Sequence, residues 1–510
     1  MPDPTLTTRT IIGLEIHVQL ATRSKLFCGC AVEFAAQPNS RVCPVCLGLP
    51  GALPVMNRRA VRLAVAAGMA LNCRIAPFTK WDRKSYYYPD LPKNYQISQY
   101  DLPLCSRGYF DIPAGPKQRR IRIIRAHLEE DAGKNIHDTP GCTLVDLNRT
   151  GTPLLEVVTE PDLASADEAY TFAVELQRLM TYLGVSEGSM QKGQMRFEPN
   201  VNVAITSGGL EYRTPISEIK NLNSFKALRS AIRYEANRQV QDWLADPGYL
   251  QGQRPNENRG WNDRRGLTEL QRTKEEAHDY RYFPDPDLVP VELDKAWLEE
   301  IRASIPELPL ARRARLVEAG GLSPQDAAAI VEDRATADLY EQALANGASV
   351  AVLTKQLINV WAKLAAERDR GIAELAVSPE RMAALAKLVD SGTVSATAAK
   401  QIAGRMLEAP EGPEALARSM GLVMVDDAEA IARWVDQALA ANEKAVQTVL
   451  TNPKKAQASE GFLRGQVMRL SGGQADPRRA GELIAERIAQ LKTDGGGDLD
   501  PPQPDADEST

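Results

Sequence analysis

The chain of 510 residues has the composition of an ordinary globular protein, with 43% hydrophobic and 25% charged residues. Its length indicates several domains, and the lack of any run of 18 apolar residues excludes a membrane-spanning helix. The net charge of −6 argues against a general nucleic-acid coat but permits a local basic patch. Because the N-terminus lacks a secretory pattern, we expect a cytoplasmic protein.

Residues 11–20 alternate apolar and polar side chains, which predicts a half-buried strand. The polar face carries Glu15 and His17, two residues apart and therefore side by side. An acid and an imidazole on a rigid strand could hold a divalent ion or relay a proton. The alternative is a polar strand face turned toward water.

Four of the seven cysteines lie within residues 28–46, as two close pairs. Two such pairs suit a tetrahedral thiolate site, and all four ligands would come from the protein. We therefore predict a structural rather than a catalytic zinc ion, the alternative being four reduced thiols in a loop. The predicted ligands are Cys28, Cys30, Cys43 and Cys46.

Residues 58–69 have the periodicity of a helix, and residues 81–100 form an aromatic, cationic segment whose prolines exclude a helix. This segment is either a well-packed loop or the wall of a site. In the second case Lys84 would be a point charge for phosphate or carboxylate.

A basic alternating strand, residues 119–126, runs into His127 and three consecutive acids, and Glu156 follows in an apolar strand. Adjacent acids repel one another unless a cation relieves them, and an acid in an apolar strand should be paired or coordinating. Glu130 and Glu156 are therefore predicted to join Glu15 and His17 in an oxygen-rich magnesium site.

A helix is predicted over residues 165–183 and an alternating strand over residues 190–203. The polar face of this strand carries Arg196, Glu198 and Asn200. The following segment, residues 218–225, contains Lys220 and leads into a helix that continues to about residue 244.

Beyond residue 291 the chain becomes rich in alanine and leucine, which indicates a helical region. Helix starts are predicted at Ser323 and Ser378, and the Pro- and Gly-rich residues 410–413 resemble a linker. Cations gather between residues 454 and 479, where they form either a solvated surface or a binding patch. The predicted parts are residues 1–293, helical residues 294–409, a tail domain over residues 410–492, and a disordered acidic tail over residues 493–510.

Several motifs resemble the family of B subunits of bacterial aspartyl/glutamyl-tRNA amidotransferases. They include GLEIH at residues 13–17, DRKSY at 82–86, HLEEDAGK at 127–134, LNRTGTPL at 147–154 and DYRYFP at 279–284, with the two cysteine pairs. The likeness covers nearly the whole chain in the family's order. One departure is Gln191, which stands where the family commonly has an acid.

The resemblance implies an α+β fold: an antiparallel-sheet catalytic domain similar to glutamine synthetase and guanido kinases, followed by helical and tail domains. It implies that ATP phosphorylates the side chain of mischarged Glu-tRNA(Gln) or Asp-tRNA(Asn), after which ammonia displaces the phosphate. Ammonia would come from a glutaminase (amidase) A subunit, with a small C subunit as a further partner, because no glutaminase nucleophile pattern occurs in the chain. The rival interpretation is a non-catalytic, zinc-containing tRNA-binding protein.

The implied cofactors are ATP, Mg²⁺ and structural Zn²⁺. The residues carried over from the family's motifs have three roles. The catalytic set is Glu15, His17, Lys84, Glu130, Glu156, Arg196 and Glu198. The ATP-binding set is Glu198, Asn200 and Lys220. The set implied to bind tRNA is Lys454, Lys455, Arg464 and Arg469.

Overall fold

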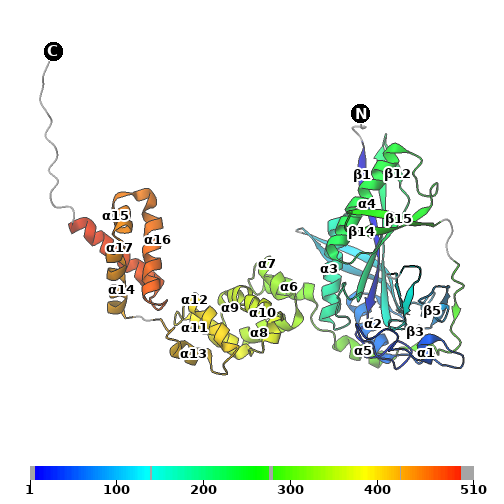
Figure 1. The fold of residues 1–510 in the computed structure, drawn as a ribbon, viewed down its shortest axis with the longest axis horizontal. Coiled ribbons are helices and arrows are strands. Elements are labelled where there is room, and N and C mark those ends of the chain that lie inside the picture. Colours follow the sequence, from blue (N-terminus) through cyan, green and yellow to red (C-terminus); the bar gives the residue numbers. More distant parts are fainter. Residues whose placement is uncertain (1–5, 116, 138–139, 275–278, 425–426, 495–510) are drawn as a thin grey trace, which may run out of the picture. The chain divides into compact units, whose positions relative to one another are not determined.

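The computed structural model describes residues 6–115, 117–137, 140–274, 279–424 and 427–494. The chain divides into two compact units, residues 1–312 and 313–510 (Figure 1). The first is a mixed α+β unit and the second is helical. The predicted acidic tail lies outside the described residues from residue 495 onward.

A ten-stranded sheet organises the first unit, in the order β15-β14-β13-β11-β1-β10-β7-β6-β2, with β12 paired to β11. Its strands are β1 (Thr7–Gln19), β2 (Arg74–Ile75), β6 (Cys105–Ala114), β7 (Lys117–Glu130), β10 (Pro153–Thr159), β11 (Met195–Ser207), β12 (Leu210–Arg213), β13 (Ser217–Lys220), β14 (Asn256–Asn262) and β15 (Leu267–Lys274).

The predicted α+β class is confirmed, but the sheet is mixed rather than purely antiparallel, which corrects that part of the prediction. Strands β13 and β14 pair in parallel, whereas the other neighbours are antiparallel. The physical reason is the connection between them, α4 (Phe225–Ala245), since a parallel pair needs a long crossover and usually receives a helix.

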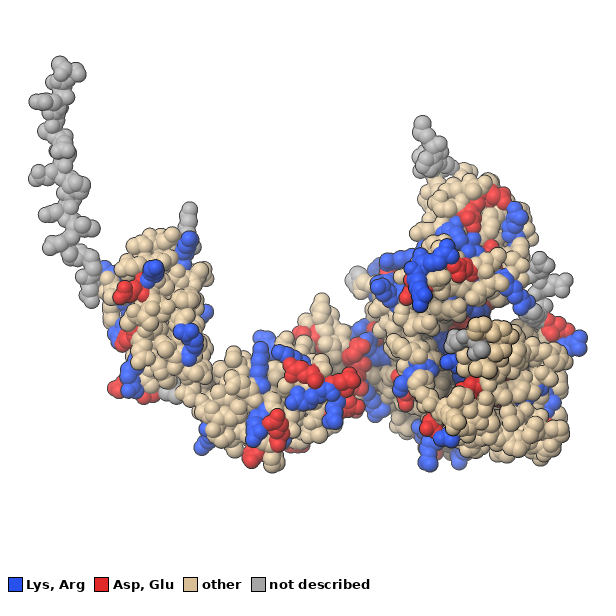
Figure 2. All heavy atoms as spheres, viewed as in Figure 1, with Lys and Arg blue, Asp and Glu red and all other residues tan. Residues whose placement is uncertain are grey.

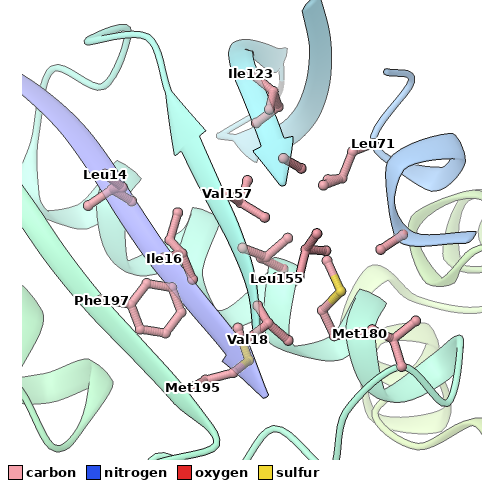
Figure 3. Close-up of a cluster of buried hydrophobic side chains, with 14 of the residues drawn as sticks. Leu14, Ile16, Val18, Leu71, Ile123, Leu155, Val157, Met180, Met195 and Phe197 are labelled. Carbon is pink, nitrogen blue, oxygen red and sulfur yellow. The ribbon is translucent and has the colours of Figure 1, made fainter. Parts of the chain in front are cut away.

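The predicted alternation of the first strand is confirmed, because Ile12, Leu14, Ile16 and Val18 are buried on one face. Neighbouring strands and helices α2 (Arg58–Ala70), α3 (Ala166–Tyr182) and α4 supply further residues of this core. Figure 3 shows Leu14, Ile16 and Val18 among side chains of neighbouring strands and of the helical layer. Each fully buried aliphatic side chain stabilises the unit by roughly 1.5–3 kcal/mol.

Short strands and one short helix complete the first unit. The segment expected to be a loop contains β4 (Asp82–Ser85) and β5 (Tyr95–Ser98), which pair with each other, and β16 (Phe283–Pro284) pairs with β4. The remaining elements are α1 (Pro44–Leu47), the pair β3 (Phe78–Thr79) and β17 (Val291–Glu292), and the pair β8 (Lys134–Ile136) and β9 (Leu144–Asp146).

The first unit continues past the predicted boundary at residue 293. Helix α5 (Lys295–Ala303) packs on α2: Arg62 Nη1 lies 2.6 Å from Glu300 Oε1, and the guanidinium of Arg58 lies over the ring of Trp297. Ile301 is buried in the core of the sheet unit. The chain therefore leaves this core only near Arg312.

The second unit consists of short helices, and the serine starts predicted at Ser323 and Ser378 are N-caps. The helices are α6 (Pro309–Glu318, which begins in the first unit), α7 (Pro324–Ile330), α8 (Arg334–Ala345), α9 (Val350–Gln356), the π-helix η1 (Leu357–Trp361), α10 (Ala362–Ala366), the 3₁₀-helix η2 (Ile372–Leu375), α11 (Pro379–Asp390), α12 (Ala396–Met406), α13 (Pro413–Ser419), α14 (Ala428–Ala441), α15 (Glu443–Thr451), α16 (Pro453–Leu470) and α17 (Pro477–Asp494).

Helices α14 to α17 have a hydrophobic core of their own, which includes Ile431, Leu463 and Ile484. Helix α13 instead packs on α11 and α12, and Met424 N–H donates to the carbonyl of Thr393. The structure thus groups residues 410–424 with the preceding helices, later than the predicted boundary at residue 410. Within the described ranges, no helix combines the length and apolarity that a membrane crossing requires.

Candidate active site

A row of polar side chains crosses three adjacent strands of the sheet. His17 of β1 stands opposite Glu156 of β10, which stands opposite His127 of β7. Directly opposed residues project from the same face of a sheet, so these side chains meet. Glu15 and Glu129 join them because each lies two residues from a histidine on its own strand. We call these five residues the acid–histidine cluster.

The ligand atoms of the acid–histidine cluster lie close together. His17 Nε2 is 3.3 Å from Glu129 Oε1, 3.5 Å from Glu156 Oε2 and 3.8 Å from Glu15 Oε1. His127 Nε2 is 3.7 Å from Glu156 Oε2. Two sets, Glu15–His17–Glu156 and His127–Glu129–Glu156, each have ligand atoms within 4.8 Å of one another, and Glu156 belongs to both.

Burial and crowding shift the titration of this cluster. Burial, followed by the charge of Glu156, raises the pKa of Glu129 to about 8. Burial acts to raise the pKa of Glu156 as well, but His127 and His17 hold it below its usual range. Burial lowers the pKa of His127 to about 4. For His17 burial is outweighed by the hydrogen bond with Glu156 and the charge of Glu129, which raise its pKa to about 9.

The donor set fits a hard divalent cation. Carboxylate oxygens are the preferred ligands of Mg²⁺, and imidazole nitrogens also bind divalent metals. The Nδ1 atoms of His17 and His127 are buried and have no hydrogen-bond partner among the described residues. Three carboxylates at close range in a poorly solvated site conflict with one another, and a cation would remove that conflict.

Glu130 does not belong to this cluster, which corrects the sequence prediction. It follows Glu129 in β7 and therefore projects from the opposite face. There it pairs with Lys93, accepts from Ile97 N–H at 2.9 Å, and borders a cavity of about 210 Å³ with Cys46 and Lys25. The missed residue, Glu129, was detectable because its spacing from His127 equals the spacing between Glu15 and His17.

Lys84 of β4 lies beside the acid–histidine cluster, as expected for a site wall. Its ammonium is 4.9 Å from the centre of the Tyr280 ring. Burial acts to lower the pKa of Lys84, but the charge of Glu129, with smaller contributions that include Glu156, raises it. Lys84 is therefore a cation held near the two most buried acids of the cluster.

A second set of polar side chains continues across the same face of the sheet. Glu198 of β11 stands opposite Glu15, and Asn200 stands opposite Glu218 of β13. Lys220 Nζ is 2.6 Å from Glu198 Oε2 and 2.8 Å from Glu218 Oε1. Despite burial, these carboxylates raise the pKa of Lys220. Glu218 is a further acid that the sequence prediction did not include.

Arg196 stands opposite His17 but is engaged elsewhere. Its guanidinium forms two hydrogen bonds with Asp131, which also pairs with Arg149 at 3.2 Å. Asp131 is buried, yet Arg196 and Arg149 keep its pKa below the usual range. Arg196 therefore lies next to the acid–histidine cluster, but its charge is largely neutralised by Asp131.

The four predicted zinc ligands converge. The thiols of Cys28, Cys30, Cys43 and Cys46 have sulfur atoms within 4.8 Å of one another. The Cys46 sulfur accepts from Cys43 N–H at 3.2 Å and from the fully buried Lys25 ammonium at 3.5 Å. Hydrogen bonding from Cys28, with a contribution from Lys25, lowers the pKa of Cys46 to about 4. The group could hold a metal ion.

Comparison with known proteins identifies the family. Residues 10–299 match the GatB/GatE catalytic domain, and residues 338–488 match the GatB domain. The chain belongs to the GatB/GatE family. It is 45% identical to the B subunit of the aspartyl/glutamyl-tRNA(Asn/Gln) amidotransferase of Carboxydothermus hydrogenoformans over 486 residues, 94% of this chain and 99% of that protein. The corresponding subunits of Moorella thermoacetica and Geobacter sulfurreducens are 45% and 44% identical, with the same two coverages.

Membership of the GatB/GatE family makes the chain an enzyme of the ligase type, one component of a tRNA-dependent amidotransferase. The matched catalytic domain includes all ten strands of the sheet that bears the acid–histidine cluster, β1 from residue 10 onward. The rival interpretation, a tRNA-binding protein without chemistry, is not favoured.

The four cations predicted to bind tRNA lie on one helix, α16. Lys455 and Arg469 share an exposed face of α16 with Phe462, because fourteen residues make almost four complete turns. Arg464 lies half a turn away, near Gly481 of α17. The side chain of Lys454 lies outside the described residues. Figure 2 shows cations and acids scattered over the visible face of α14–α17.

Gln191, the departure from the family pattern, is exposed in the turn before β11. Its side-chain oxygen accepts from Ser189 Oγ at 3.4 Å, and the neighbouring Lys192 donates from Nζ to Glu187 Oε2 at 3.4 Å. These contacts are local to the turn.

Proposed function

We propose that this chain uses ATP to phosphorylate the side-chain carboxylate of mischarged Glu-tRNA(Gln) or Asp-tRNA(Asn) at the acid–histidine cluster. Ammonia then attacks the acyl carbon, the phosphate leaves, and Gln-tRNA(Gln) or Asn-tRNA(Asn) results. The observation that carries the proposal is the pair of three-residue donor sets that share Glu156. Phosphoryl transfer is catalysed mainly by positioning and charge neutralisation, and such a site can supply both.

The residues of the site divide into ligands for Mg²⁺, contacts for the nucleotide and a cation for the substrate carboxylate. Glu15, His17, Glu129 and Glu156 would hold Mg²⁺, which neutralises phosphate charge when bound. On the adjoining strands Glu198, Asn200 and Lys220 would contact the nucleotide, with the Lys220 ammonium facing phosphate oxygens. Lys84, on the other side of the cluster, is suited to orient the substrate carboxylate.

Ammonia would be supplied by another protein of the same complex. The relatives are named as B subunits, which implies a larger complex. We propose that this chain assembles with a glutaminase A subunit and a small C subunit. Further proposals are a cytoplasmic location and a catalytic fold related to glutamine synthetase and guanido kinases.

The proposed reaction is tested with the purified chain, ATP, Mg²⁺, an ammonium salt and mischarged tRNA. We expect ATP cleavage that depends on the mischarged tRNA, and conversion of the tRNA-linked glutamate or aspartate to its amide. Assaying Glu-tRNA(Gln) and Asp-tRNA(Asn) separately identifies the natural substrate. Binding of tRNA without ATP cleavage, also in the assembled complex, would contradict the proposal.

The cysteine cluster is proposed to hold one structural zinc ion through Cys28, Cys30, Cys43 and Cys46. We expect metal analysis to find about one zinc per chain, with Zn–S distances of about 2.3 Å by X-ray absorption. The Lys25 ammonium beside Cys46 would stabilise the thiolate form.

Removing this zinc is expected to lower the melting temperature, because its ligands join two separate loops. Replacement of Cys46 by serine should abolish stoichiometric zinc binding. The same replacement at Cys142, an exposed thiol outside the cluster, is the matched control and should retain it. Absence of zinc together with four freely reactive thiols at positions 28, 30, 43 and 46 would disprove the assignment.

A further inference from the structure

A buried polar network joins α4 to the strands on the side of the sheet away from the acid–histidine cluster. Its centre is the carboxylate of Glu235, which is fully buried. This carboxylate accepts from Arg238 Nη2 at 2.6 Å, from Thr268 Oγ1 at 2.7 Å and from Gln239 Nε2 at 3.1 Å. A fully satisfied network of this kind rigidifies the elements that it connects.

Ser217 connects this network to β13. Its hydroxyl oxygen accepts from Gln239 Nε2 at 3.0 Å and from Arg238 Nη2 at 3.4 Å, and the residue is completely buried. Side chains alternate along a strand, so Glu218 and Lys220 project from the other face. Strand β13 thus carries Ser217, which contacts the network, on its buried face, and Lys220, a candidate phosphate-binding cation, on the face that bears the acid–histidine cluster.

Strand β13 is short: four residue pairs join it to β14 and Ile219 is buried in the core, but its pairing with β11 is limited. It comprises four residues, and its register with β11 includes only two pairs, Asn200 with Glu218 and Val201 with Ser217. Its other neighbour, β14, is held by the same network, because Glu257 Oε2 accepts from Arg238 at 3.0 Å and from Arg259 at 2.8 Å. The side chains beneath the sheet therefore contribute to the position of Lys220, together with the pairing of β13 with β14.

We propose that Glu235 and Ser217 are positioning residues that hold Lys220, through β13, at the place where it meets the phosphates of ATP. The inference rests on the proposed nucleotide-binding role of Lys220. Neither positioning residue touches the nucleotide, so their effect is transmitted by the backbone of β13.

Two variants that each remove one hydroxyl from the network test this inference. Ser217→Ala removes the link to β13, whereas Thr268→Val removes the link to β15, which carries no proposed site residue. In the assembled enzyme, we expect Ser217→Ala to raise the KM for ATP roughly tenfold, the lower end of the effect of removing an orienting partner. Thr268→Val should leave the KM for ATP near the wild-type value, although it should lower the melting temperature about as much as Ser217→Ala does.

A double-mutant cycle with Lys220→Met completes the test. If Ser217 acts through Lys220, the KM for ATP of the double variant equals that of Lys220→Met alone. Equal KM values for Ser217→Ala and Thr268→Val, or independent effects of Ser217→Ala and Lys220→Met, would overturn the positioning role. An unchanged KM for ATP in Lys220→Met would overturn the nucleotide-binding role itself and the inference with it, so the two failures are distinguishable.

Discussion

Replacing Glu129 by glutamine is expected to abolish tRNA-dependent ATP cleavage, whereas the same change at the adjacent Glu130 is expected to spare it. Glu129 lies 3.3 Å from His17 in the acid–histidine cluster, and Glu130 points to the other face of β7. Loss of one group that stabilises developing charge typically lowers the rate by roughly 100- to 1,000-fold. Glu15→Gln should resemble Glu129→Gln.

The decisive measurement is phosphorylation of the tRNA-linked carboxylate at saturating Mg²⁺, with an ammonium salt as nitrogen source. The two variants are expected to differ in stability in the opposite sense: Glu130→Gln should be the less stable protein and Glu129→Gln the less active one. Glu129→Gln replaces a carboxyl whose ionisation burial and Glu156 already disfavour, so folding should be unharmed or slightly improved. Glu130→Gln leaves the buried Lys93 without its partner, at a cost of about 3 kcal/mol. A wild-type rate in Glu129→Gln would place the cation site elsewhere.

Deleting residues 427–510 is expected to weaken binding of mischarged tRNA by roughly 100-fold at low salt, because the deletion removes several phosphate-binding cations together. The deletion is placed at residue 427 since α13 packs on α11 and α12, and a cut at residue 410 would expose that core. Helices α14–α17 have their own core, so the remaining chain should stay folded. Fluorescence anisotropy with labelled tRNA measures the affinity.

Point variants of α16 refine this test. Lys455→Ala and Arg469→Ala remove cations from the face that bears the exposed Phe462, whereas Arg464→Ala removes one half a turn away. For each cation that no longer binds a phosphate, the slope of log affinity against log salt falls by about one. We expect this change for Lys455 and Arg469 and not for Arg464. Undiminished tRNA binding by the 427–510 deletion would refute the role of the tail.

Local patterns were sufficient to predict several of the elements that carry the site, although β4 and β13 were not predicted as strands. The two-residue period of β1 placed Glu15 and His17 on one face, and burial of Ile12 to Val18 on the other confirms it. Ser165 and Ser224 begin α3 and α4 as N-caps, close to the predicted helix starts. The cysteine spacing likewise anticipated the convergence of four thiols. The strand and helix predictions rest on backbone periodicity and capping, and the thiol prediction rests on the spacing of two cysteine pairs.

Tertiary structure decided which residues meet. The sequence shows three consecutive acids after His127, but only the pairing of β7 with β10 places Glu129 beside Glu156 and turns Glu130 toward Lys93. The contact of Lys220 with Glu198, and its support from Glu235 beneath the sheet, join segments far apart in the chain. The sequence by itself determined the family, the longer strands of the site and the kinds of ligand. Strand order and register decided which residues belong to the site, because a register shift of one residue moves every side chain of a strand to the other face.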